Sequence, residues 1–239
     1  MTYQQPIFGS RPNGGFRPVS GLATAASVLI VLVLLAETLS AYTDWHVYGA
    51  AQAYDSGADP DRADLLAAVG VSSAGLVLLA LTSIAAGIVF LVWLWRARIN
   101  AEGFSGPDAH RRGRGWTIGG WFCPIVNWWF PFQIVADIWR ASDPGRREEQ
   151  PGLVMAWWFL YLAQTAVVLA TFHNTLGTAT PTDQQLSTAA TAATVTTAVH
   201  AAAGVLIIMV IRRITQWQNQ PRPDVTEYPP FPSASPTAF

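Results

Sequence analysis

The side chains that could bind a ligand or carry a proton lie in three places along this sequence. The first place is a basic stretch that sets five arginines against two acids, the arginines being Arg96, Arg98, Arg111, Arg112 and Arg114. A guanidinium group binds phosphate through two parallel hydrogen bonds, so these residues are candidates for contacting a phosphate-bearing lipid or a partner protein. A second interpretation is that they only fix the topology beside anionic headgroups, at about 1 kcal/mol each.

The second place is an apolar, tryptophan-rich segment that carries Asn127, Asp137 and Arg140. An unpaired polar group is costly in apolar surroundings, so these side chains must find partners or serve a function. We expect Asp137 to pair with Arg140 one turn later, or with Arg96 or Arg98. Structural pairing is the favoured interpretation over a role in transport or catalysis.

The third place comprises two ionisable residues inside long apolar runs, Glu37 and His200. Ionisable groups within a membrane are functional candidates by default, which makes an ion- or proton-coupled role one hypothesis. Glu37 is about 5 residues, or about 8 Å, from the outer end of its run, whereas His200 lies near the middle of its own. The two residues are therefore expected at different depths, with no direct proton transfer between them.

No residue pattern predicts a catalytic centre, a metal site or a cofactor. The chain lacks the His-Glu-x-x-His zinc motif, the Gly-x-x-x-x-Gly-Lys phosphate loop and the Gly-x-Gly-x-x-Gly dinucleotide motif. Its single cysteine, Cys123, excludes an intrachain disulfide and a thiolate-rich metal site. A formal net charge of -1 argues against a nucleic-acid partner. The sequence thus favours a protein that is not an enzyme.

Long apolar runs must position these side chains, because 51% of the 239 residues are hydrophobic and only 12% are charged. About 20 helical residues cross a hydrocarbon core of about 30 Å. The runs that reach this length are 22–42, 65–95, 152–172 and 186–211. We therefore predict an all-α membrane protein whose four transmembrane helices form a domain over 21–217.

The two ends of the chain are rich in proline, glycine and polar residues and show no apolar period. Residues 1–20 and 218–239 are therefore predicted to be disordered tails on the cytoplasmic side. Because Arg11 and Arg17 precede the first apolar run, a cleaved signal peptide is an alternative to a retained helix. No clear small-x-small cleavage site follows the run, which favours retention.

A fifth apolar segment, 115–142, decides the topology. If it does not cross the membrane, 13 of the 14 arginines lie on one side and only Arg62 lies on the other; if it crosses, the division is 7 and 7. The positive-inside rule favours the first arrangement, with both termini in the cytoplasm. Pro124 and Pro131 interrupt the segment. We predict a proline-broken re-entrant or interfacial helical hairpin between the second and third transmembrane helices.

Tryptophans gather in this segment and at the helix ends that border it. Indole rings prefer the boundary between membrane and water, so their distribution agrees with a segment at the inner leaflet. Trp128 and Trp129 are accordingly candidates for contacting lipid or a partner.

The stretch from Trp95 to Pro144 combines the patterns Arg-x-Asn-Ala, Gly-Trp, Pro-x-x-Asn, Pro-x-Gln and Asp-Ile-Trp-Arg. With these patterns the chain resembles, over roughly residues 65–215, an uncharacterised family of bacterial membrane proteins catalogued as domain of unknown function 4328. The resemblance implies a four-helix integral membrane domain. It supplies no catalytic residues.

The leading hypothesis is a multi-pass protein of the bacterial plasma membrane that forms a non-enzymatic platform at the cytoplasmic face. Its expected partners are anionic membrane lipids or a protein. One alternative is a small oligomeric transporter or channel, since helices broken within the membrane often build ion sites. Another is a membrane enzyme acting on a lipid-linked substrate. A stripe of small residues in the fourth run favours close helix packing and could also serve a homo-oligomer.

Overall fold

The computed structural model describes residues 15–58, 62–145, 151–175 and 182–220, and this part of the chain is helical with no strand. The all-α prediction is therefore confirmed. The α-helices are α1 (Ser20–Asp55), α2 (Arg62–Ser105), α3 (Trp116–Phe122), α4 (Phe130–Ser142), α5 (Gly152–Thr175) and α6 (Asp183–Gln218). Two short 3-10 helices, η1 (Pro107–Ala109) and η2 (Val126–Trp128), lie between α2 and α4.

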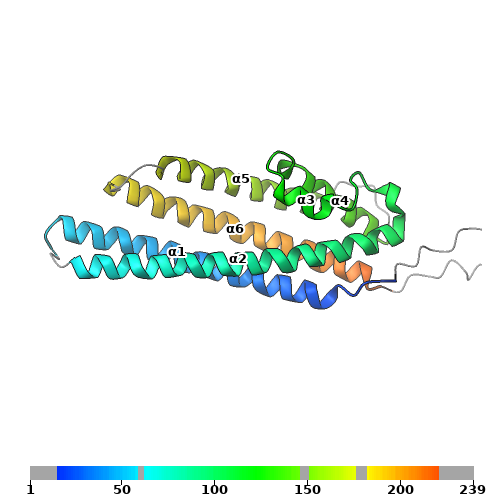
Figure 1. Ribbon diagram of the computed structural model, residues 1–239, viewed down its shortest axis with the longest axis horizontal. Coiled ribbons are helices and arrows are strands. Elements are labelled where there is room, and N and C mark those ends of the chain that lie inside the picture. The colour runs from blue at the N-terminus through cyan, green and yellow to red at the C-terminus, as the bar shows by residue number, and fades with distance from the viewer. Residues whose placement is uncertain (1–14, 59–61, 146–150, 176–181, 221–239) are drawn as a thin grey trace, which may run out of the picture.

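Four long helices, α1, α2, α5 and α6, lie side by side with alternating direction (Figure 1). Each contains a stretch that is long and apolar enough to cross a membrane. Only 11% of the most apolar 18-residue stretch of α2 is buried inside the protein. Large apolar side chains on these helices are thus left facing outward, as expected where lipid is the solvent.

The long helices extend beyond the apolar runs, because polar residues continue the helix at both ends. For example, α1 has 36 residues and α2 has 44. A helix of 44 residues, such as α2, measures about 66 Å, more than twice the thickness of the hydrocarbon core.

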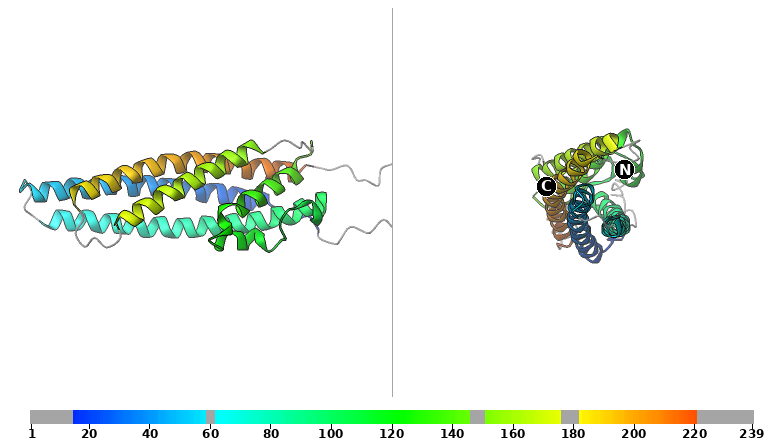
Figure 2. Two further views of the ribbon diagram at one scale, coloured as in Figure 1. Left: turned by 90° about the horizontal axis from the view of Figure 1, so that it is seen from above. Right: turned by 90° about the vertical axis from the view of Figure 1, so that its left-hand side faces the viewer.

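The best-packed part of the core lies at one end of the bundle, where α1 and α5 begin and α2 and α6 end. Trp93 and Leu94 of α2 are fully buried there against Ile134 and Ile138 of α4 and Ile211 of α6. Figure 2 also places the short helices α3 and α4 at this end. We call it the cluster end, because the basic residues described below gather there.

Prolines act differently at their two positions in the segment between α2 and α5. Pro124 lies in the break between α3 and η2. Pro131 lies in the first turn of α4, where a missing N–H costs no hydrogen bond within the helix. Pro131 therefore interrupts the segment by beginning a new helix and not by breaking one.

Parts of the predicted tails are ordered at the cluster end. Val19 is fully buried, and the backbone of Arg17 is hydrogen-bonded to α2. Gln218, at the other predicted tail, is 3% exposed. The tails predicted over 1–20 and 218–239 are thus too long at their inner ends, and residues 1–14 and 221–239 lie outside the described part of the chain.

Candidate functional site

Five arginines and two buried carboxylates form a connected group at the cluster end, which we call the arginine cluster. The end of α2, the loop before α3 and the helix α4 supply its members. They are Arg98, Glu102, Arg111, Arg112, Arg114, Asp137 and Arg140. Gly106, with a φ of 82°, lets the chain turn sharply after α2 and bring the loop back along it.

One half of the cluster is built around Glu102. Its Oε1 accepts a hydrogen bond from Arg98 Nε at 2.8 Å, and its Oε2 accepts one from Arg114 Nε at 3.0 Å. Burial of Glu102 raises its pKa, but the hydrogen bonds from Arg114 and Arg98 outweigh burial, so that the pKa is lowered overall. The carboxylate therefore stays ionised and holds both guanidinium groups.

Arg98 cannot serve as a lipid contact, contrary to its place among the sequence candidates. Its side chain is 1% exposed, and its Nη2 donates to the carbonyl oxygen of Arg112 at 2.6 Å. A buried charge paired in this way orders the loop around it. Arg98 is thus a structural anchor for the arginines of the loop.

The other half of the cluster is built around Asp137, which is 5% exposed. Arg111 donates from its backbone N to Oδ2 at 3.0 Å and from its Nε to Oδ1 at 2.9 Å. Arg140 Nη1 donates to Oδ1 at 3.1 Å, so the expected pairing within α4 is present. Arg96 instead donates to the carbonyl of Pro18 at 3.2 Å. The pairing with Arg111 was not anticipated, because the two residues are 26 positions apart.

Three arginines of the loop keep part of their surface open. The side chain of Arg111 is 44% exposed and that of Arg114 is 50% exposed. Arg112 is half-buried: its Nε donates to Gln133 Oε1 at 2.9 Å and its guanidinium lies 4.1 Å from the centre of the Phe130 ring. Among the described residues no carboxylate pairs with Arg112. The loop arginines are therefore held in place and still accessible.

An apolar surface lies on the segment that follows these arginines. Its exposed side chains belong to α3, η2 and the turns beside them, namely Trp116, Phe122, Ile125, Trp128 and Trp129. Phe122 is 73% exposed and Ile125 is 71% exposed. Asn127, the remaining polar candidate of this segment, lies in η2 and makes no hydrogen bond to Asp137 or Arg140. We call this surface the aromatic face.

Sequence reasoning missed a polar junction formed by Asn100 and Gln218. Asn100 Oδ1 accepts from Arg17 N, and its Nδ2 donates to Arg17 O, both at 2.8 Å. Its Nδ2 also donates to Gln218 Oε1 at 3.0 Å, and Gln218 Nε2 donates to Ser142 Oγ at 2.8 Å. The junction therefore joins the N-terminal segment, α2, α4 and α6. The pattern Arg-x-Asn-Ala was a signal that Asn100 has a role.

Glu37 and His200 are direct partners, and the expectation that they lie at different depths is wrong. His200 Nδ1 and Glu37 Oε1 are 2.5 Å apart. Glu37 lies 17 residues after the start of α1 at Ser20, and His200 lies 18 residues before the end of α6 at Gln218. Because these two helix ends lie together, equal distances along antiparallel helices bring the side chains to the same height. The prediction had measured depth from the ends of the apolar runs instead.

Within the described residues no group of three or more potential metal ligands comes together. The arrangement at the cluster end is suited to holding an anion at a surface, since it offers fixed guanidinium groups beside an apolar face.

Comparison with known proteins identifies a family. The sequence model of a family described as Domain of unknown function (DUF4328) matches residues 54–216, which include α2 to α5, most of α6 and the whole arginine cluster. No curated protein and no solved structure matches the chain.

Proposed function

The chain belongs to the DUF4328 family, whose domain has no assigned function, and from its residues we propose that it is a platform for anionic lipids. In this proposal the protein is a non-enzymatic, multi-pass protein of the bacterial plasma membrane. The observation that carries the proposal is the position of the arginine cluster beside the aromatic face at one end of four apolar helices.

The proposal places the cluster end in the cytoplasm. That orientation puts 13 of the 14 arginines on the cytoplasmic side, as the positive-inside rule favours. The segment 115–142 then acts as an interfacial or re-entrant hairpin, which dips into the inner leaflet. Support comes from the chain path, because α2 ends and α5 begins at the same end of the bundle.

The charges of the arginine cluster favour an anionic surface. Five guanidinium groups face two carboxylates, which leaves three positive charges in excess. An arginine close to an anionic leaflet is stabilised by about 1 kcal/mol. Because Glu102 and Asp137 order the loop, binding a lipid headgroup costs little further side-chain entropy.

The aromatic face supplies the second half of the interaction. Trp128 and Trp129 are 48% and 41% exposed, and tryptophan favours the headgroup level of a bilayer. Apolar side chains beside basic ones are typical of segments that lie in the membrane interface. The platform would thus bury its aromatic face among acyl chains and offer its arginines to the headgroups.

The test is the lipid selectivity of the reconstituted full-length protein. Spin-labelled phosphatidylglycerol and phosphatidylcholine would each be added to proteoliposomes, and the motionally restricted fraction measured. Arg112→Gln removes a loop charge without leaving a buried carboxylate unpaired. We expect this variant to lose roughly fivefold in preference for the anionic lipid, the factor that corresponds to about 1 kcal/mol.

Arg62→Gln is the matched control, because Arg62 begins α2 at the opposite end of the bundle and is exposed. Arg62→Gln should leave the preference for the anionic lipid unchanged if that preference arises at the cluster end. Equal selectivity in the wild type and Arg112→Gln would contradict the platform.

A second candidate function rests on the contact between Glu37 and His200. Two titratable side chains 2.5 Å apart within membrane-spanning helices could bind and release a proton. We expect liposome proton flux to be the same in the wild type and Glu37→Gln if the protein is a platform. A flux that Glu37→Gln abolishes, and that His46→Gln at an exposed position retains, would instead favour the transporter.

A further inference from the structure

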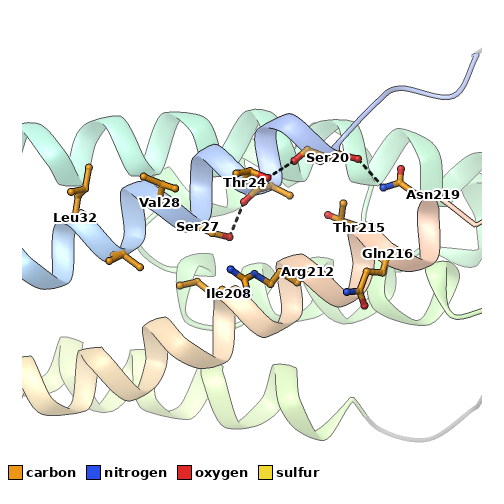
Figure 3. Close-up of a pocket in the computed structure, with 12 residues that line it drawn as sticks. Ser20, Thr24, Ser27, Val28, Leu32, Ile208, Arg212, Thr215, Gln216 and Asn219 are labelled. Carbon is orange, nitrogen blue, oxygen red and sulfur yellow. Dashed lines mark hydrogen bonds between the residues drawn. The ribbon is translucent and has the colours of Figure 1, made fainter.

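A groove of about 410 Å³ runs between the first turns of α1 and the last turns of α6 (Figure 3). It lies at the cluster end but uses none of the residues of the arginine cluster. Its wall on α1 runs from Ser20 to Leu32, and its opposite wall runs from Ile208 of α6 to Asn219, the residue just after that helix. Its volume lies within the range of about 300–1,000 Å³ that is typical of small-molecule sites.

The groove is polar at its outer part, where Arg212 supplies a positive charge. Arg212 is exposed, and no carboxylate or other side chain within the described ranges pairs with it. Figure 3 shows its guanidinium pointing across the groove toward α1. The neighbouring Arg213 points elsewhere and lies over the Trp217 ring at 5.1 Å. Arg212 is thus the cation that the groove offers to a ligand.

Hydroxyl groups of α1 complete the polar part of the groove. Thr24 and Ser27 donate to carbonyls of their own helix, at 3.2 Å and 2.8 Å. Ser20 Oγ accepts from Asn219 Nδ2 at 2.8 Å, and within the described part of the chain its own O–H donates to no acceptor. Ser20 therefore offers a hydrogen-bond donor at the outer end of the groove, beside Asn219.

The groove becomes apolar toward the middle of the bundle. Val28, Val31 and Leu32 of α1 and Ile208 of α6 line this part, and the first three are 53%, 46% and 44% exposed. These side chains lie within the stretches of α1 and α6 that could span a membrane. The complete wall on α1 covers 13 residues, or about 18 Å of helix from first to last. A ligand that fits must therefore be anionic at one end and aliphatic at the other.

We propose that this groove binds one anionic phospholipid, with its phosphodiester on Arg212 and an acyl chain along Val28, Leu32 and Ile208. Arg212 lies 6 residues, or about 9 Å, before the end of α6, which is a suitable height for a headgroup. A free anion would use only the polar part and leave the aliphatic walls open. The inference goes beyond the platform, because it needs only that α1 and α6 span a bilayer.

The test is native mass spectrometry of the full-length protein released from mild detergent. The wild type should retain one phosphatidylglycerol per chain in preference to phosphatidylcholine, and excess inorganic phosphate should not displace it. Arg212→Gln should lower the retained fraction roughly tenfold or more, as the loss of a charge-assisted hydrogen bond implies. Val28→Trp, which fills the apolar part without changing charge, should lower it as well.

Arg213→Gln is the matched control, because it removes a charge from the next position of the same helix but outside the groove. It and Arg112→Gln should both keep the lipid, which separates this site from the platform. Equal retention of the lipid in the wild type and Arg212→Gln would overturn the proposal. Circular dichroism should match the wild type in both Arg212→Gln and Arg213→Gln, so that a loss of lipid is not a loss of fold. Displacement of the bound lipid by inorganic phosphate alone would also overturn the proposal. So would a protein dimer that Val28→Trp dissociates, because a second chain would then occupy the groove.

Discussion

His110 is a histidine of the basic stretch that folding buries. It is 8% exposed and lies beside the buried Arg98, which also repels a second positive charge. Burial first, and Arg98 second, lower the pKa of His110 below its ordinary value. The folded protein therefore holds His110 neutral, and an unfolded chain binds a proton there more readily.

This difference predicts a loss of stability in mild acid. As the pH falls through about 6.5, the ordinary value for histidine, the unfolded state gains a proton that the folded state does not. The free energy of unfolding should therefore fall as the pH is lowered from about 7.5 to about 5.5. Thermal unfolding in detergent, measured across roughly this pH range, would show the decrease. His110→Gln should flatten this part of the profile.

His46→Gln is the control for that measurement, because His46 is exposed on α1. It should leave the wild-type slope unchanged. An identical slope in the wild type and His110→Gln would show that another group is responsible. A separate loss of stability is expected at lower pH, when Glu102, whose pKa is lowered, is finally protonated.

At the scale of elements, the contact between α1 and α6 depends on a small residue. A Cβ atom added at Gly204 would lie 3.0 Å from Leu34 Cδ1 and 3.5 Å from Ile30 Cγ2. Small residues allow membrane helices to approach closely, and a larger side chain forces them apart. The same contact holds Glu37 against His200, one turn away along α6.

Gly204→Ile should therefore destabilise the bundle by about 1–3 kcal/mol, as overpacking usually does. Gly204→Ala should cost less, because only the flexible end of Leu34 has to move. Gly87→Ile is the matched control: Gly87 is exposed on α2, and nothing lies within 4 Å of an added Cβ. Unfolding temperatures in detergent would measure all three, and an equal effect at both glycines would contradict the close contact.

At the scale of the whole molecule, the arginine cluster and the groove share one end, while the turn after α1 lies at the other (Figure 1). A lipid-binding function at the cytoplasmic face requires that the segment between α2 and α5 does not cross the membrane. The orientation can be tested because the chain has one cysteine, Cys123.

In a Cys123→Ser background, Ser56→Cys and Gly145→Cys place single thiols at exposed positions of the two ends. A membrane-impermeant maleimide should label Ser56→Cys in intact cells, because the turn after α1 is predicted to be outside. Gly145→Cys, just after α4, should react only after the membrane is permeabilised. Labelling of both Ser56→Cys and Gly145→Cys in intact cells would mean that residues 115–142 cross the bilayer, and labelling of Gly145→Cys alone would mean that the orientation is inverted.

Much of the architecture could be predicted from local patterns. Run length and low charge predicted four long helices, because crossing a bilayer requires about 20 apolar residues whatever the neighbours are. The family resemblance also followed from local motifs. It was placed over roughly residues 65–215, close to the matched residues 54–216.

Partners between distant residues depended on helix directions and relative heights, which no local pattern contains. Glu37 and His200 meet although 163 positions separate them. Arg98 is buried, while its neighbours in the basic stretch stay accessible, because the loop folds back over the end of α2. The groove at Arg212 exists only where two antiparallel helices bring a hydroxyl-bearing face and a basic one together. Ionic and packing partners are thus set by how helix ends align in space, whereas helix formation is set by composition along the chain.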